Sequence, residues 1–143
     1  MARPKSSSVP PARKVSTVLR FSLRDANRSL PLISRIVSDI VHTHNVAAQL
    51  QHKIEKSLNL KEQADLHEEM ENKIDRLTEY VEELTLVGCE IKDYEIGLVD
   101  FRARHQGRDV CLCWKLGEDH IYYWHEQTSS YAGRQPVSVL VEG

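Results

Sequence analysis

The sequence lacks the features that mark secreted and membrane-spanning proteins. It has three cysteines in 143 residues. Two of them, Cys111 and Cys113, lie too close along a strand to form a disulfide easily, so the sequence favours a reducing compartment, the cytoplasm. No apolar run approaches the ~20 residues of a membrane span, so we expect no membrane partner. No apolar segment follows the basic N-terminus, so we do not expect a secretory signal.

The chain also lacks a strong excess of either charge. Its formal net charge is -2 and its pI is about 6.4, so nucleic acid is not an expected partner. Positive charge is concentrated in a segment without acids, which carries Arg3, Lys5, Arg13, Lys14, Arg20 and Arg24. Residues 1–16 are rich in Ser and Pro, which predicts a disordered basic tail followed by one domain over residues 17–143. Contact of the tail with phosphate or an anionic membrane is the alternative.

Helix signals are clear in the first half. Ser22 with Asp25 three residues later predicts a helix start near Leu23. Pro31 predicts that this helix is short, over about residues 23–29, and that a second helix starts at Pro31 and runs to about Ser57. The segment "TVLRF" before them is typical of a short edge strand.

A third helix is expected between a turn at Asn59 and a stop at Gly88. Its apolar residues step by four and three, as in a coiled coil: Leu66, Met70, Ile74, Leu77, Val81 and Leu84. The short loop predicts an antiparallel helical hairpin over about residues 23–87. A hairpin this long has few apolar residues for its surface, and we therefore expect a homodimer.

From Cys89 the period changes to two, which predicts a three-stranded antiparallel β-meander over about residues 96–126. Turns at Gln106–Gly107 and at Gly117–Glu118, the second of type II′, set its registers. The two registers agree on one packing face: Val99, Phe101, Ala103, Val110, Leu112, Trp114, Ile121 and Tyr123. The other face then carries Asp100, Arg102, Arg104, Cys111, Cys113, Lys115, Tyr122 and Trp124. Residues 127–143 are expected to be irregular, with "VSVLV" as a last strand or a flexible end. The expected fold class is α+β.

The cysteines and histidines of the meander suggest a zinc site, but the alternation of side chains along the strands argues against it. Cys111 and Cys113 share the outer face, whereas His125 follows Ile121 and Tyr123 on the packing face. Cys-x-Cys spacing is also shorter than zinc sites prefer. We therefore predict no metal and no cofactor.

Cysteine nucleophile chemistry is also disfavoured. Asp100, opposite Cys113, would raise the pKa of that thiol, and no histidine is expected on their face. The catalytic residues stay unknown, and an enzyme is less favoured than a binding protein.

Binding remains as the main hypothesis: an interaction or ligand-binding module for a protein or a small anionic ligand. The candidate binding residues lie near one end of the meander: Asp100, Arg108, Glu118, Trp124, His125, Glu126 and Arg134. The structural alternative is that Trp124 packs under the C-terminal segment while Arg134 forms a salt bridge with Asp100 or Glu126. The alternative function is a small enzyme or metal-binding protein with a polar site at His125, Glu126 and Arg134.

Several short stretches resemble a known family. "ANRSLP", "GLVDF", "CWKLGE", "YWHE" and "AGRQP" are similar to the bacterial family called domain of unknown function 2203. The resemblance implies a bacterial protein and no particular activity, cofactor or substrate. It implies that the signature of the family includes Asp100, Gly107, Arg108, Trp114, Gly117, Glu118, Trp124, His125, Gly133, Arg134 and Pro136.

Overall fold

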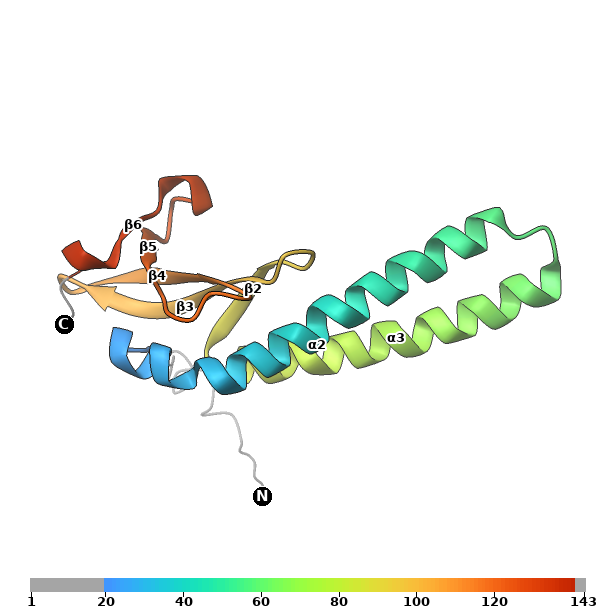
Figure 1. Cartoon of the computed structure of the whole chain (residues 1–143), viewed down its shortest axis with the longest axis horizontal. Helices are drawn as coiled ribbons and strands as arrows, with labels where there is room; N and C mark the ends of the chain where they lie inside the picture. Colours follow the sequence, from blue (N-terminus) through green and yellow to red (C-terminus); the bar gives the residue numbers. More distant parts are fainter. Residues whose placement is uncertain (1–19, 141–143) are drawn as a thin grey trace, which may run out of the picture.

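Two long helices precede five antiparallel strands (Figure 1). The structure is a computed structural model that describes residues 20–140, so the basic tail over residues 1–16 lies outside the described part. The helices are α2 (Leu23–Lys56) and α3 (Leu60–Val87). The strands are β2 (Cys89–Asp93), β3 (Leu98–His105), β4 (Arg108–Lys115), β5 (Tyr123–Glu126) and β6 (Gln135–Pro136). Short 3-10 helices cover η1 (Tyr131–Gly133) and η2 (Val137–Val139). The expected α+β class is confirmed.

The first helix begins where its cap signal predicts, but it is not broken at Pro31. Ser22 Oγ accepts a hydrogen bond of 3.0 Å from the Asp25 N–H, and α2 then continues through Pro31 to Lys56. The predicted separate helix over residues 23–29 is therefore wrong. A proline inside a helix costs about 3 kcal/mol. The buried side chains of Ala26, Leu30 and Ile33 lie on both sides of Pro31, and burying each of the larger ones contributes about 1.5–3 kcal/mol, which offsets that cost.

Capping residues set the two ends of α3. Asn59 Oδ1 accepts a hydrogen bond of 2.9 Å from the Glu62 N–H, which satisfies a free donor in the first turn of α3. Gly88 ends α3 with φ of 111°, in the left-handed region that glycine adopts without strain. The predicted antiparallel hairpin is confirmed, with α2 and α3 side by side (Figure 1).

The sheet has the strand order β2-β3-β4-β5-β6, so it contains two more strands than predicted. The predicted register between β3 and β4 is confirmed, with Val99 opposite Trp114 and Phe101 opposite Leu112. The turn between them is the predicted one, and Gln106 and Gly107 both have positive φ, at 52° and 79°.

The predicted register between β4 and β5 is wrong by one residue. Leu112 lies opposite Trp124, not Tyr123, and Cys111 lies opposite His125. Because side chains alternate along a strand, this shift turns every side chain of β5 to the other face. Trp124 is therefore in the core, at 2% exposed, and His125 lies on the outer face with the cysteines.

The reason for the shift lies in the turn after β4. The Glu118 N–H donates to the Lys115 carbonyl at 3.0 Å, so Gly117, with φ of 104°, is the second central residue of this turn rather than the first. The next residues leave the ladder, since the Ile121 N–H donates to Asn27 Oδ1 on α2 at 2.8 Å. The chain returns to β4 at Tyr123, one residue out of the predicted register.

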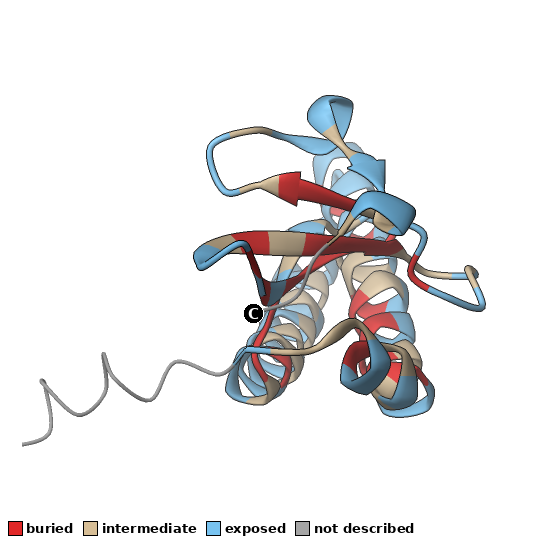
Figure 2. Cartoon of the chain, turned by 90° about the vertical axis from the view of Figure 1, so that its left-hand side faces the viewer, coloured by how far each residue is buried: buried red, intermediate tan, exposed pale blue. Residues whose placement is uncertain are grey.

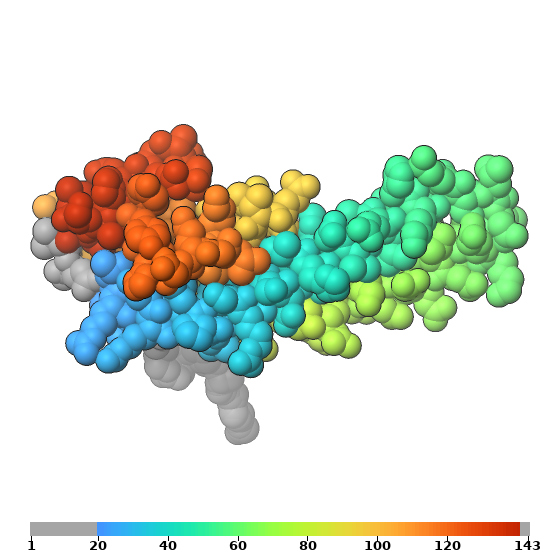
Figure 3. Space-filling model, in the orientation of Figure 1, coloured from blue at the N-terminus to red at the C-terminus, as the bar shows by residue number. Residues whose placement is uncertain are grey.

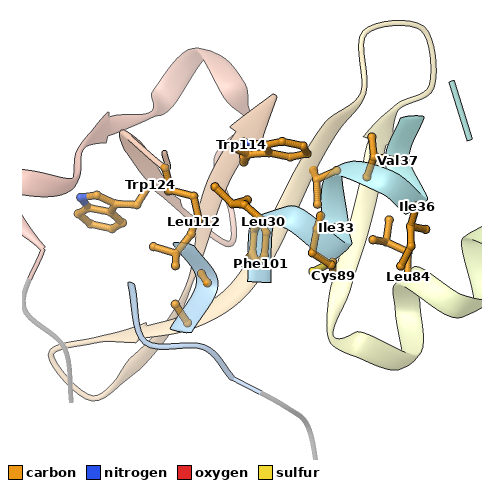
Figure 4. Packing of buried hydrophobic residues seen from close by; sticks show 14 of the residues in the cluster. Leu30, Ile33, Ile36, Val37, Leu84, Cys89, Phe101, Leu112, Trp114 and Trp124 are labelled. Carbon is orange, nitrogen blue, oxygen red and sulfur yellow. The ribbon is translucent and has the colours of Figure 1, made fainter. Parts of the chain in front are cut away.

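The core lies between the helices and one face of the sheet, as the view in Figure 2 shows. Trp114, Phe101 and Leu112 from the sheet are fully buried, and they face Leu30 and Ile33 of α2 (Figure 4). These apolar side chains fill the face of the sheet that packs on the helices, so the opposite, outer face is the one that can carry polar groups. Above that outer face lies the C-terminal segment (Figure 1).

The remaining predictions on the ends of the domain have mixed outcomes. Residues 17–19 of "TVLRF" lie outside the described residues, and Phe21 makes one backbone hydrogen bond of 2.7 Å to the Arg102 carbonyl without a strand being formed. The first residues of "VSVLV" form η2 rather than a strand. Within residues 20–140 the structure has no helix with the length and apolar character that crossing a membrane requires.

Candidate functional site

A histidine and an aspartate meet on the outer face of the sheet. His125 Nε2 lies 3.0 Å from Asp100 Oδ1, and each residue is 4% exposed. The two residues come from β5 and β3, which are not neighbours, so the imidazole extends across β4. On β4, Cys111 lies opposite His125 and Cys113 lies opposite Asp100. The one-residue shift of β5 therefore assembles a cluster that strand parity alone had separated.

The hydrogen bonds of His125 restrict what the pair can do. Its Nδ1 atom lies 2.7 Å from the backbone carbonyl oxygen of Glu126. A carbonyl only accepts, so Nδ1 carries a proton and donates it. The Nε2 atom then presents to Asp100 either a second N–H or a lone pair. The first state is a buried ion pair. In the second, the lone pair accepts a hydrogen bond from a protonated Asp100 carboxyl or binds a metal cation.

Cys111 adds a third ligand atom to this pair. The Sγ atom of Cys111, a carboxylate oxygen of Asp100 and a ring nitrogen of His125 all lie within 4.8 Å of one another. Zn²⁺ bond lengths of about 2.0–2.3 Å place the ligands of one tetrahedral ion about 3.5 Å apart. Small side-chain movements, of about 1 Å, therefore suffice for all three residues to hold one ion.

The electrostatics of the site keep its thiols protonated. Burial, followed by the Asp100 carboxylate, raises the pKa of Cys111 to about 12. The same two causes raise the pKa of Cys113 to about 11. Reactive cysteines are thiolates at neutral pH, so the site does not have the character of a cysteine nucleophile. A bound metal ion reverses this effect, because a cation stabilises the thiolate that binds it.

The cluster lies in an open pocket of about 600 Å³, within the range of ligand-binding pockets in proteins. One wall is the outer face of the sheet, and the other is the loop that follows β5. The lining residues are Glu90, Lys92, Leu98, Asp100, Cys111, Cys113, His125, Gln127, Ser129, Ser130 and Tyr131. Lys92 Nζ lies 3.0 Å from Glu90 Oε1, so these two charges at the edge of the pocket already balance each other.

The structure brings two of the predicted site residues together and separates others. Asp100 and His125 form the buried pair, whereas Arg108 Nε donates to Glu126 Oε1 at 2.9 Å on the exposed surface. Glu118 supports its own turn, since Glu118 Oε1 accepts a hydrogen bond of 2.9 Å from the Lys115 N–H. Neither Glu126 nor Glu118 lines the pocket, and Trp124 belongs to the core.

Arg134 has different neighbours from those expected. The salt bridge predicted for it does not form, because Asp100 pairs with His125 and Glu126 pairs with Arg108. Its guanidinium carbon lies instead over two tyrosine rings, 4.2 Å from the centroid of Tyr123 and 4.0 Å from that of Tyr131. Both are cation–π distances.

The resemblance to a known family is confirmed by comparison. The family model described as uncharacterized conserved protein (DUF2203) matches residues 20–137. The chain belongs to this family. The match covers every residue of the cluster and pocket in this DUF2203 protein. Comparisons with curated proteins and with solved structures gave no match.

Sequence reasoning missed several pocket residues of this DUF2203 chain. Glu90 and Lys92 lie on β2, a strand that was not predicted, although "CEIKD" alternates between inward and outward residues. The contact between Cys111 and His125 is hidden in the sequence, because strand parity in the predicted register places the two side chains on opposite faces. Tyr131 lies in the irregular segment after β5, where no periodic signal exists.

Proposed function

We propose that the protein binds a divalent transition metal ion through Asp100, Cys111 and His125. One observation carries the proposal: the Nδ1–H of His125 donates to a backbone carbonyl, while Nε2 faces a carboxylate oxygen at 3.0 Å. Histidine ligands of metals have this arrangement, in which the outer hydrogen bond fixes the tautomer and orients the ring. The proximity of Cys111 supports a metal rather than a simple ion pair, since an ion pair needs no third ligand.

The ligand types favour zinc among the common metals. Thiolate, imidazole and carboxylate together suit Zn²⁺, which is a borderline-soft ion, whereas Mg²⁺ and Ca²⁺ prefer oxygen ligands. Three protein ligands leave a fourth position open, which is the arrangement of catalytic rather than structural zinc sites. A thiol ligand has to stay reduced, and we therefore propose a cytoplasmic location for the protein.

The charges of the pocket also favour a cation as its first ligand. Asp100 and Glu90 are carboxylates that line the pocket, and Lys92 is the lysine that lines it. Among the lining residues, carboxylates therefore outnumber the lysine by one, which favours a cation at the ligand group. A bound metal ion changes this balance.

Metal titration with a matched pair of cysteine variants tests the proposal. The apo protein is titrated with Zn²⁺ calorimetrically, and the purified protein is assayed for bound metal. Cys111→Ser is expected to weaken zinc binding by more than the about 10–100-fold that loss of an outer-shell partner costs. Cys113→Ser is the control, because Cys113 lies on the same strand and face but outside the ligand group.

The proposal fails if the wild-type protein takes up no stoichiometric metal, or if both cysteine variants bind zinc as tightly as the wild type. Equal loss in both variants would also contradict it, because that result points to a general effect on folding or on the pocket rather than to ligation by Cys111.

A separate proposal concerns self-association. We propose that the helical hairpin pairs with a second copy of the chain. Figure 3 shows that the far half of α2 and α3 projects beyond the sheet. In α3 only Leu84 is buried, and Ile74, from the predicted seam, is 45% exposed. The other seam residues are half-buried, apart from the buried Leu84, so a partner hairpin that covers Ile74 would remove the remaining exposed apolar surface of the seam from water.

Light scattering tests the dimer. The expected mass is twice the 16.4 kDa of one chain, and a mass of 16.4 kDa contradicts the proposal. Ile74→Glu is expected to shift the mass towards one chain without unfolding, since the side chain is already partly exposed. Lys61→Glu is a control at the exposed end of the same helix.

A further inference from the structure

Arg134 contacts Tyr131, a residue that lines the pocket, and among residues 20–140 it forms no salt bridge. Two ring contacts, with Tyr123 and Tyr131, hold the guanidinium in place. Cation–π contacts do not use the N–H donors of the guanidinium, which are able to bind an oxyanion in a bidentate manner. An arginine held in this way is oriented before any ligand arrives, so little conformational entropy is lost on binding.

The neighbours of Arg134 place it next to the pocket. Tyr131, whose ring contacts the guanidinium, lines the pocket. Tyr123, whose ring also contacts the guanidinium, lies opposite Cys113 on the outer face of the sheet. The guanidinium is therefore at the rim of the pocket, on the side of β5.

We propose that the metal-loaded pocket binds a small monocarboxylate, which fills the open position of the metal and pairs with Arg134. This inference rests on the proposed metal site. A divalent ion, Lys92 and Arg134 bring four positive charges to the site, while Asp100, Glu90 and the Cys111 thiolate bring three negative ones. One positive charge is left over, and a monoanion neutralises it.

A carboxylate suits both ends of this site. One of its oxygens is a good ligand for Zn²⁺, and its planar edge matches the fork of the guanidinium. Leu98 and the ring of Tyr131 add apolar surface to the pocket, which suits the hydrocarbon part of a small organic acid better than it suits inorganic phosphate.

The test measures the binding of acetate to the full chain loaded with Co²⁺ or Zn²⁺. Acetate is expected to change the visible spectrum of the cobalt form and to bind with heat release in calorimetry. Arg134→Gln is expected to weaken acetate binding at least fivefold while metal affinity stays unchanged. Arg108→Gln removes the same charge from an exposed pair with Glu126 and is expected to leave acetate binding as in the wild type.

The outcomes separate the two proposals. Absence of metal uptake overturns the proposed function, whereas metal uptake without any response to acetate overturns the monocarboxylate inference alone. A response to inorganic phosphate but not to acetate also overturns it, because the ligand class is then a phosphate. Equal acetate binding by the wild type and Arg134→Gln, with both proteins folded by circular dichroism, overturns the role of Arg134.

Discussion

Replacing Asp100 by Asn separates metal binding from the packing of the site. An asparagine has the shape of the aspartate, and its amide N–H is able to donate to His125 Nε2, which lies 3.0 Å from the carboxylate in the wild type. The fold of the metal-free Asp100→Asn protein is therefore expected to survive. The amide is a much poorer ligand for Zn²⁺ than the carboxylate, so metal binding is expected to be lost.

The magnitude follows from the linkage between binding and folding. At a zinc concentration of 100 times the dissociation constant, bound metal stabilises the wild type by about 2.7 kcal/mol. For a domain of this size, about 1 kcal/mol raises the melting temperature by about 4 °C, so zinc is expected to raise it by about 10 °C. A loss of about 100-fold in affinity leaves about 0.4 kcal/mol, which is a rise of about 2 °C at the same concentration.

The assay is thermal unfolding followed by circular dichroism, with zinc and with a chelator, for the wild type, Asp100→Asn and Asp100→Ala. The Ala variant leaves Nε2 without a partner and is expected to lose about 1–3 kcal/mol of stability even with chelator present. A zinc-induced rise in Asp100→Asn as large as in the wild type refutes the assignment of Asp100 as a ligand. The absence of a rise in the wild type, with Asp100→Asn destabilised by about 3–5 kcal/mol, is the result expected for a simple buried ion pair.

Three further predictions concern the thiol, a tight turn and the shifted strand. Because the pKa of Cys111 is raised from 9.0 to about 12, the thiolate is about a thousandfold scarcer below pH 9 than for an ordinary thiol. The assay is alkylation of Cys111 by iodoacetamide in the folded metal-free protein, followed by mass spectrometry. The reaction is expected to be slow and its rate to rise with pH up to about pH 12. A rate that reaches a plateau near pH 9 contradicts this. Gly97 has φ of 74°, and an added Cβ would lie 2.8 Å from a side-chain atom, so Gly97→Ala is expected to cost about 2–5 kcal/mol in urea unfolding. Gly117 also has positive φ but open space around it, so Gly117→Ala is expected to cost only about 1–2 kcal/mol. Equal costs contradict the packing of the turn at Gly97. Trp124→Ala is expected to cost about 3–5 kcal/mol, and Tyr123→Ala, at a half-buried position, is expected to cost less. The reverse order would support the register predicted from the sequence, in which Tyr123 faces the core.

The ends of the helices could be predicted because their signals are local. Ser22, Asn59 and Gly88 each act on backbone groups within one turn of the helix, and each has the predicted role in the structure. The effect of Pro31 is also local, but its outcome depends on burial of the surrounding apolar face against the sheet. The sheet is formed by residues distant in sequence, so the local pattern predicts a helix break at Pro31 that the structure does not have.

The site depends on a contact that the sequence does not reveal. The turn at Gly117 and the bond between Ile121 and Asn27, which are 94 residues apart, decide the register of β5. A shift of one residue brings His125 to Asp100 and turns Trp124 into the core. The periodic pattern fitted the wrong register almost as well, because Tyr123 and Trp124 are both large aromatic residues.

X-ray absorption at the zinc edge of the zinc-loaded full chain tests the central claim most directly. A shell with one sulfur at about 2.3 Å and nitrogen or oxygen ligands at about 2.0–2.2 Å is expected, and the sulfur is expected to disappear in Cys111→Ser but not in Cys113→Ser. A shell without sulfur in the wild type, or a sulfur that persists in Cys111→Ser, contradicts the assignment of this cluster as the metal site.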